Sequence, residues 1–342
     1  MNSAILARID YLSVLQKSLH HEATAAAIAE AQQSNPWFIP EFANAALQAI
    51  SQKMLSREAL LKWLTPYTVS NEFQPKKLVG LVMAGNVPLV GFHDFLCAYL
   101  LGFSMQIRLS SKDDSLFHFV LEKLMAIDPQ LKAQLTFVNK LEHYDAVIAT
   151  GSDNTFRYFE YYFRNHPRVL RRNRNSVAVL SGNESLQELQ GLADDVLLYF
   201  GFGCRNVSKL FVPESFEVES LFPHFEKYKW MHQHTKYMNN YDYNRTLLLL
   251  NKVPHLSNDF LMIQENTAIA SPIAVLYFER YHNIETVRQE LQQRADKIQC
   301  VVSQLDLETR TVPFGQSQQP ELNDYADGVD TIDFLLKLGS EN

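Results

Sequence analysis

The chain of 342 residues is poor in glycine and in cysteine, and it lacks a long hydrophobic run. It has 12 glycines, about half of what average usage of roughly 7% would give, which excludes glycine-repeat fibres and flexible linkers. Cys97, Cys204 and Cys300 form no CxxC pair, so we expect no disulfide framework and a reducing compartment, the cytoplasm. Without a signal-peptide pattern or an apolar run of about 18 residues, we predict neither secretion nor a membrane span.

The sequence also lacks a large net charge of either sign. The sequence has 31 Lys and Arg against 38 Asp and Glu, for a formal net charge of −7. This mild acidity argues against nucleic acid as a partner. A hydrophobic content of 46% is typical of a folded protein and excludes intrinsic disorder. The length predicts two domains, because single cores stop growing near about 250–300 residues.

Hydrophobic periodicity divides the chain. Residues 1–70 carry apolar side chains at helical spacing and predict a helical N-terminal layer. Beyond them, short apolar strands alternate with helices, which is typical of an α/β protein with doubly wound parallel sheets. We expect domains over 71–175 and 176–310 and a tail over 311–342. The expected strands are 78–84, 105–109, 135–138, 146–150, 176–180, 209–212, 246–250, 260–263, 273–278 and 300–302. The expected helices are 3–20, 42–64, 88–101, 114–127, one opening near 154, 185–200, 221–237, 283–297 and 330–338.

Cys204 is the strongest candidate for chemistry. It lies between a predicted helix and a predicted strand, after Gly201 and Gly203, which permit a tight backbone. The neighbouring Arg205 would favour the reactive thiolate. The alternative is that a single cysteine is a small buried hydrophobe, and this is what we expect of the other two cysteines.

Asn86 and Gly151-Ser152 each follow a predicted strand. The carboxyl edge of a parallel sheet is where α/β proteins bind ligands, although both segments are equally suited to cap a helix. The usual GxGxxG fingerprint is absent. His232 and His234 would lie on opposite sides of a helix without further ligands, so we predict no metal site.

Several motifs, taken together in this order, resemble the aldehyde dehydrogenase superfamily. Within it, the chain is similar to the acyl-CoA reductases of the bacterial bioluminescence type. The motifs are Asn86-Val87-Pro88, Arg108-Leu109-Ser110-Ser111, Thr150-Gly151-Ser152, Gly203-Cys204, Gln264-Glu265 with Ser271-Pro272, Val312–Gln318 and Asp324–Gly328.

The resemblance implies an aldehyde dehydrogenase-like fold, with a cofactor-binding domain over 71–175 and a catalytic domain over 176–310. The tail would return to the site. Cys204 would be the nucleophile, and the Asn86 amide would hold the oxyanion with the Cys204 backbone N–H. The implied cofactor-binding residues are Arg108, Ser110, Ser111, Lys112, Thr150, Gly151, Ser152 and Glu265.

Two departures from the family pattern refine this implication. The segment Arg168–Arg172 has no carboxylate where hydrolytic members carry the glutamate that activates water, so a thioester on Cys204 would survive for reduction or thiol exchange. Ser111 replaces the acidic residue that binds a ribose 2′-hydroxyl, and Lys112 follows it, which favours a 2′-phosphate. We therefore expect NAD(P)H-dependent reduction of an acyl-CoA to an aldehyde, with NADPH as cofactor and NADH as the alternative.

Two other functions stay open at this point. One is a CoA-independent aldehyde dehydrogenase that takes its glutamate from elsewhere. The other is a cofactor-binding member without turnover of its own. The implied partner is the acyl-CoA substrate, and both a homodimer and a complex with an acyl-processing enzyme stay open.

Overall fold

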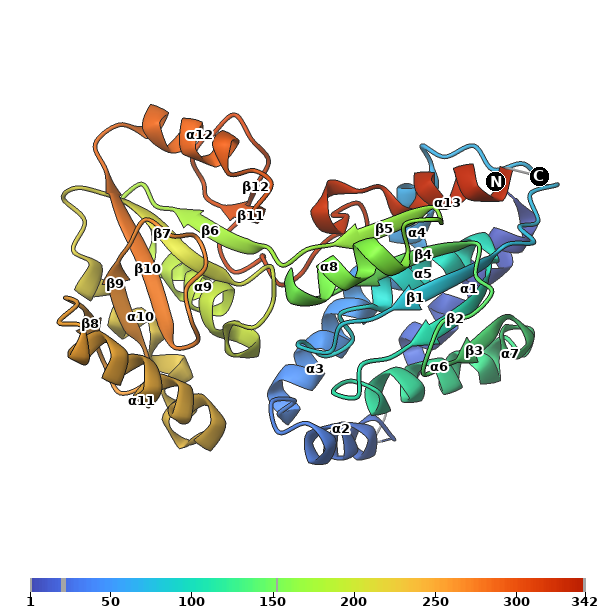
Figure 1. Ribbon diagram of the computed structural model, residues 1–342, viewed down its shortest axis with the longest axis horizontal. Coiled ribbons are helices and arrows are strands. Elements are labelled where there is room, and N and C mark those ends of the chain that lie inside the picture. The colour runs from blue at the N-terminus through green and yellow to red at the C-terminus, as the bar shows by residue number, and fades with distance from the viewer. Residues whose placement is uncertain (1, 20–22, 152, 341–342) are drawn as a thin grey trace. The chain divides into compact units, whose positions relative to one another are not determined.

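The computed structural model describes residues 2–19, 23–151 and 153–340 (Figure 1). The chain forms two compact units. Unit 1 comprises Met1–Arg172 and Pro320–Asn342, and unit 2 comprises Asn173–Gln319. The expected tail over 311–342 is therefore divided between the two units.

Unit 1 contains a five-stranded parallel sheet in the order β3-β2-β1-β4-β5. The chain adds β2 and β3 on one side of β1 and then crosses to β4 on the other, so the strand order reverses between β1 and β4. Such a reversal is the point at which open α/β sheets bind ligands. The strands are β1 Leu78–Val82, β2 Ser104–Arg108, β3 Leu135–Phe137, β4 Ala146–Thr150 and β5 Arg168–Arg171.

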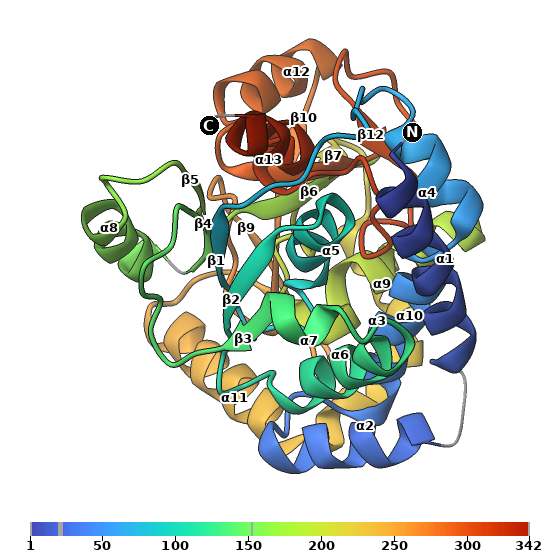
Figure 2. The same cartoon turned by 90° about the vertical axis from the view of Figure 1, so that its right-hand side faces the viewer.

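Helices cover both faces of this sheet. Figure 2 shows α5 and α6 with the N-terminal helices on one side and α8 on the other. The layer α1–α4 shares one hydrophobic core with α5 and α6, so it packs as part of unit 1. The helices are α1 Ser3–Ser18, α2 Ala23–Ser34, α3 Pro40–Ala49, the π-helical turn η1 Ile50–Met54, α4 Arg57–Leu64, α5 Phe92–Leu101, α6 Ser115–Ile127, α7 Leu131–Gln134, α8 Asp153–Tyr162, η5 Ala326–Gly328 and α13 Thr331–Ser340.

Unit 2 contains a seven-stranded sheet in the order β12-β11-β6-β7-β10-β9-β8. All neighbouring strands are parallel except β8 and β9. The predicted α/β class with parallel sheets is confirmed. The strands are β6 Asn175–Val179, β7 Val207–Pro213, β8 Leu256–Ser257, β9 Met262–Glu265, β10 Val275–Tyr281, β11 Ile298–Val302 and β12 Thr311–Val312. Its helices and helical turns are α9 Leu186–Leu197, η2 Leu198–Gly201, η3 Val218–Leu221, α10 Phe222–Phe225, η4 Glu226–Gln233, α11 Thr235–Leu250 and α12 Ile284–Gln293.

The predicted strand over 246–250 is wrong, because these residues end α11. Tyr237, Tyr241 and Asn244 are buried at spacings of four and three, which is the pattern of one helix face. Packing of that face stabilises the helix. The leucine-rich end of the helix continues past the buried face, and Leu250 is 74% exposed.

Several other boundaries also differ. The expected helix over 221–237 is a succession of short turns (η3, α10 and η4), and β5 was not predicted. The expected helix over 42–64 is divided by the π-helical turn and by Ser56. Gly102 adopts a left-handed conformation, φ 83°, just past α5 as predicted, whereas Gly339 lies inside α13 and not beyond its end.

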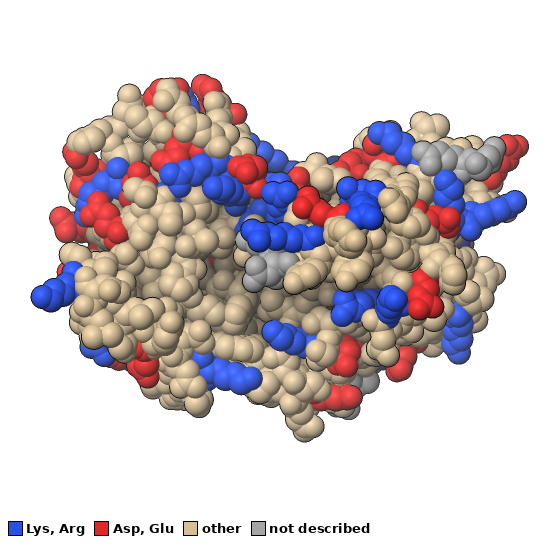
Figure 3. Space-filling view, in the orientation of Figure 1, with Lys and Arg blue, Asp and Glu red and all other residues tan. Residues whose placement is uncertain are grey.

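The surface carries charges of both signs. On the face drawn in Figure 3, Lys and Arg side chains are interspersed with Asp and Glu. None of the helices in the described ranges is both long and apolar enough to cross a bilayer.

Candidate functional site

Three predicted site segments gather at the carboxyl edge of the unit 1 sheet. Asn86, the turn after Arg108, and Gly151 follow β1, β2 and β4. In register, Val82 of β1 pairs with Arg108 on one side and Ala149 on the other. The three segments therefore flank the position where the strand order reverses. Ser152 lies outside the described residues.

The turn that carries Asn86, residues 85–89, is fixed by close contacts. A Cβ on Gly85 would lie 2.5 Å from both Cβ and Oγ of Ser110, so only glycine fits there. Asn86 is exposed, and α5 begins at Phe92 with Gly91 as its N-cap. The alternative that Asn86 caps this helix is therefore wrong, and so is the expected start of the helix at Pro88, since further turns intervene.

A buried carboxylate, that of Asp113, is hydrogen-bonded to the backbone of this turn. Asp113 is 4% exposed, and its Oδ2 accepts a hydrogen bond of 2.6 Å from the Leu89 backbone N–H. Leu89 has a φ of 57°, a strained conformation for a branched residue. Burial raises the pKa of Asp113 to about 7; the Leu89 N–H opposes this and the charge of Asp114 adds to it. No local pattern in the sequence marks Asp113 for this role.

The turn after β2 carries hydroxyl groups and cations. Arg108, Ser111 and Lys112 are exposed, and Ser110 is half-buried. The Ser110 hydroxyl accepts the Lys112 backbone N–H at 3.3 Å. The Asn35 side chain, from the end of α2, donates to the Lys112 carbonyl at 3.0 Å. The turn is thereby held while its charged side chains face solvent, as contacts to phosphate groups require.

In unit 2, Cys204 lies in the nucleophile loop, residues 199–206, between α9 and β7. Tyr199, Phe200 and Gly201 all have positive φ, between 56° and 76°. Such conformations cost about 1–3 kcal/mol each for non-glycine residues and persist only where packing imposes them. Phe200 is 1% exposed. Three rings pack on its ring, those of Trp230, His234 and Tyr237.

Asn206 ties the nucleophile loop to the end of α9. Its buried side-chain amide donates to the carbonyls of Asp195, Val196 and Leu198, the shortest contact being 2.7 Å to Leu198. Its Oδ1 accepts the Gly203 backbone N–H at 2.8 Å. One side chain therefore caps the helix and fixes the residue that precedes Cys204.

Ser176, on β6, contacts two cysteines. Its fully buried hydroxyl donates to the Cys204 carbonyl at 3.0 Å, accepts the Cys300 backbone N–H at 3.2 Å and lies 3.0 Å from the Cys300 sulfur. Cys204 is half-buried, whereas Cys97 and Cys300 are buried as expected, and none of the three forms a disulfide. Burial raises the pKa of the Cys97 thiol, so its thiolate is disfavoured.

Glu265 ends β9 and is exposed. It pairs with Phe278 of β10, which pairs with Leu210 of β7. In the sheet, Glu265 therefore lies level with Leu210, which is about 10 Å beyond Val207, the first residue of β7.

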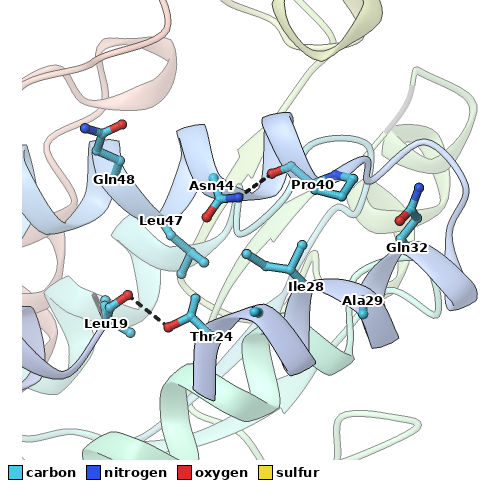
Figure 4. Close-up of a pocket in the computed structure, with 10 residues that line it drawn as sticks. Leu19, Thr24, Ile28, Ala29, Gln32, Pro40, Asn44, Leu47 and Gln48 are labelled. Atoms are coloured by element: carbon cyan, nitrogen blue, oxygen red, sulfur yellow. Dashed lines mark hydrogen bonds between the residues drawn. The ribbon is translucent and has the colours of Figure 1, made fainter. Parts of the chain in front are cut away.

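A cavity of about 600 Å³ lies between α2 and α3. Figure 4 shows Ile28 and Leu47 on its walls with the amides of Gln32 and Asn44. It contains none of the predicted site residues.

A comparison with family models matches most of the chain. The family model described as acyl-CoA reductase (LuxC) matches residues 11–221, more than half of the chain and a range that includes Asn86 and Cys204. No curated protein matches the chain significantly.

Solved structures of aldehyde dehydrogenases share the fold. Aldehyde dehydrogenase 21 from Physcomitrella patens, in complex with succinate, is 11% identical with a TM-score of 0.69, covering 98% of this chain and 84% of that one. The acetylating aldehyde dehydrogenase from Geobacillus thermoglucosidasius is 12% identical with a TM-score of 0.61, covering 90% and 77%. The NAD+ complex of the Bacillus cereus aldehyde dehydrogenase is 14% identical with a TM-score of 0.62, covering 89% and 72%.

With the family match spanning both predicted catalytic residues and the aldehyde dehydrogenase fold around them, the chain belongs to the acyl-CoA reductase (LuxC) family.

Proposed function

We propose that the chain reduces an acyl-CoA to an aldehyde through a thioester on Cys204, with a nicotinamide dinucleotide as reductant. Family membership establishes acyl-CoA reductase activity as the class of reaction. The observation that carries the nucleophile assignment is the nucleophile loop. Cys204 is the half-buried cysteine of the three. Packing and buried hydrogen bonds hold the strained backbone of its loop, which is the rigidity that a covalent catalyst needs.

The first step is transfer of the acyl group to the enzyme. The Cys204 thiolate attacks the thioester carbonyl, a C–S bond to Cys204 forms, and the C–S bond to coenzyme A breaks. The proton lost by Cys204 ends on the released coenzyme A thiol. A reduced nicotinamide, when bound, supplies the hydride that converts the enzyme thioester to a thiohemiacetal, which collapses to aldehyde and restores the Cys204 thiolate.

The oxyanion of each tetrahedral species requires donors. We assign this role to the Asn86 side-chain amide and to the Cys204 backbone N–H, on the strength of the family resemblance. The fixed turn beneath Asn86 supports the assignment, because a preorganised donor needs no rearrangement during the reaction. One such donor contributes about 2.7–4 kcal/mol to lowering the barrier.

The absence of a carboxylate from residues 168–172 supports reduction over hydrolysis. The segment in which the resemblance places that glutamate forms β5 and continues to Arg172. Its one buried side chain with a charge, Arg171, is paired with Asp94 at 2.7 Å. A thioester on Cys204 therefore has no carboxylate from this segment to activate water against it.

The residues at the carboxyl edge of the unit 1 sheet fit a nicotinamide dinucleotide. Hydroxyls of Ser110 and Ser111 and the cations of Arg108 and Lys112 are suited to phosphate and ribose groups. We propose that Thr150, Gly151 and Ser152 line the pyrophosphate path and that Glu265 binds the nicotinamide ribose. The Bacillus cereus neighbour was solved with NAD+, and the pair Ser111 and Lys112 favours NADPH in this chain.

Cofactor choice is tested by Lys112→Gln. We expect the KM for NADPH to rise about tenfold, from the loss of one charge-assisted contact, with the KM for NADH little changed. Lys132→Gln, at an exposed lysine on α7, is the matched control. Equal effects on the two cofactors would contradict the 2′-phosphate assignment, and a carboxylic acid product would contradict the reductase mechanism.

Cytoplasmic location and assembly, as a homodimer or with an acyl-processing enzyme, stay predictions.

A further inference from the structure

The tail segment, residues 311–318, reaches the residue next to the nucleophile. Its first two residues form β12, which extends the unit 2 sheet beside β11. Farther along, the Ser317 carbonyl accepts a hydrogen bond of 2.5 Å from Nε of Arg205. Arg205 follows Cys204 directly in the chain, so this bond fixes the guanidinium that lies closest in sequence to the thiol.

A buried carboxylate on α9 shapes the tail segment at this contact. Asp195 has no exposed surface, and it accepts the Gly315 backbone N–H at 2.7 Å and the Ser317 backbone N–H at 2.9 Å. The two bonds clamp a turn around Gly315, whose φ is 78°. This turn orients the Ser317 carbonyl toward Arg205.

Two glycines allow the tail segment to approach α9 this closely. A Cβ on Gly191 would lie 2.9 Å from the Gly315 nitrogen and from the Phe314 carbonyl carbon. These are backbone atoms that cannot rotate away, so any larger residue at Gly191 would displace the turn. Glycine inside a helix costs about 1 kcal/mol relative to alanine, and the close approach accounts for its presence here.

The same part of α9 also holds the nucleophile loop. Asn206 bonds to the carbonyls of Asp195 and two neighbouring residues while it fixes Gly203. The end of α9 is therefore a common support, with the nucleophile loop attached through Asn206 and the tail segment attached through Asp195. Arg205 joins the two attachments.

We propose that the tail segment is a positioning element of the nucleophile site, which holds Arg205 so that its positive charge favours the thiolate of Cys204. Asp195 and Gly191 act through the tail segment and are positioning residues. The inference rests on the proposed role of Cys204, and it adds a part of the site that lies outside the range matched by the family model.

The charged groups at this end of α9 are Asp194, Asp195 and Lys227. Burial raises the pKa of Asp195 to about 6, hydrogen bonds from Gly315 and Ser317 oppose that effect, and the adjacent Asp194 adds to it. Asp194 is itself paired with Lys227 at 2.7 Å. At neutral pH Asp195 is therefore mostly ionised, and a carboxylate can accept both backbone N–H groups of the tail segment.

The test measures the Cys204 thiol without turnover. The full-length protein is alkylated with iodoacetamide over pH 5–10, and the rate at Cys204 is followed by peptide mass spectrometry. The variants are Arg205→Gln, Arg205→Lys, Gly191→Ala and Asp195→Asn, with Gln190→Ala, an exposed α9 position, as the matched control. Thermal unfolding of each variant confirms that it is folded; Gly191→Ala keeps the test decisive if Asp195→Asn does not fold.

We expect the apparent pKa of Cys204 in the parent protein to lie below the ordinary value of about 8.5. Arg205→Gln should raise it by about one unit, which makes alkylation at pH 7 about tenfold slower. Gly191→Ala and Asp195→Asn should shift it in the same direction, Arg205→Lys should partly restore it, and Gln190→Ala should leave it unchanged.

Two results would overturn the proposal. An unchanged pKa in Arg205→Gln would show that the guanidinium does not act on the thiol. A raised pKa in Arg205→Gln but not in folded Gly191→Ala would remove the tail segment from the site. Failure of the proposed function is distinguishable, since it would appear as an absence of acyl transfer to Cys204 in the parent protein, with these alkylation profiles intact.

Discussion

The turn of Asn86 in unit 1 and the tail segment beside the nucleophile loop in unit 2 are each held by a buried aspartate that accepts backbone N–H groups. Asp113 accepts one such group, from Leu89, and its Oδ1 has no hydrogen-bond partner. Asp195 accepts two, from Gly315 and Ser317. Burial raises the pKa of both, to about 7 for Asp113 and about 6 for Asp195. Each accepted N–H favours the ionised form and so opposes the rise in pKa that burial causes.

The two regions also differ in what they hold in place. The Asp113 carboxylate acts directly on the turn that presents Asn86. Asp195 acts indirectly, through the tail segment and Arg205. Asn206 and Ser176 hold the nucleophile loop itself. We therefore expect the unit 1 turn to depend on one buried contact and the unit 2 loop on several.

The largest expected effect is that of Cys204→Ser, which should abolish acyl-CoA reduction. A serine hydroxyl at neutral pH is a far weaker nucleophile than a thiolate. The measurement is acyl-CoA-dependent oxidation of NADPH. Cys97→Ala, at a buried cysteine of unit 1, is the control and should retain activity. A Cys204→Ser enzyme that keeps most of the parent rate would contradict the assignment.

Asn86→Ala should have the next largest effect, lowering kcat by about 10²–10³ through loss of one oxyanion donor. The KM for acyl-CoA should change less, because the donor acts mainly on the transition state. Val90→Ala, at an exposed position just after the same turn, serves as control. An unchanged kcat would remove Asn86 from the oxyanion role.

The last effect concerns stability and not rate, and it sharpens the comparison between the two aspartates. A carboxyl whose folded-state pKa is raised contributes stability that is lost as pH rises from its unfolded pKa through its folded pKa. Asp113 has a pKa near 7. The stability lost by the time the pH reaches 7 is therefore about 4 kcal/mol, at about 1.4 kcal/mol per pKa unit. The stability of Asp113→Asn relative to the parent should therefore increase from pH 4 to pH 7 and then level off.

Asp195→Asn provides the matched series. Its relative stability should level off about one pH unit lower and change by about 3 kcal/mol, at the same rate per pKa unit. Urea unfolding at each pH measures both. The same pH profile for the two variants would contradict the view that the number of accepted N–H groups separates the two carboxylates.

The sequence was sufficient for the parts of the fold that follow from local pattern. The all-apolar run at β1 and the helices after it predicted parallel sheets, and strand ends predicted that Asn86 and Gly151 would share an edge. The structure adds the turn after Arg108 to that edge. The leucines at 246–250 misled because a short apolar run suits a strand or a helix equally. Burial of Tyr237 and Tyr241, earlier in the same segment, decides in favour of the helix.

The supporting side chains could not be predicted, because their roles depend on contacts between distant parts of the chain. Asp195 and Gly315 are separated by 120 residues in sequence, and Ser176 and Cys300 by 124. Nothing local marks a buried Asp or Ser as a support for a loop. The sequence identified the residues proposed to touch substrate, and the structure identified those that hold them.

The central claim is that Cys204 carries the acyl group, and intact-mass analysis tests it most directly. The protein is incubated with acyl-CoAs of graded chain length without any nicotinamide, and the adduct is mapped by peptide mass spectrometry. We predict one acyl group on Cys204, removed by added coenzyme A and absent from Cys204→Ser. Aldehyde production with NADPH in a protein that forms no such adduct, or an adduct at another residue, would contradict the account.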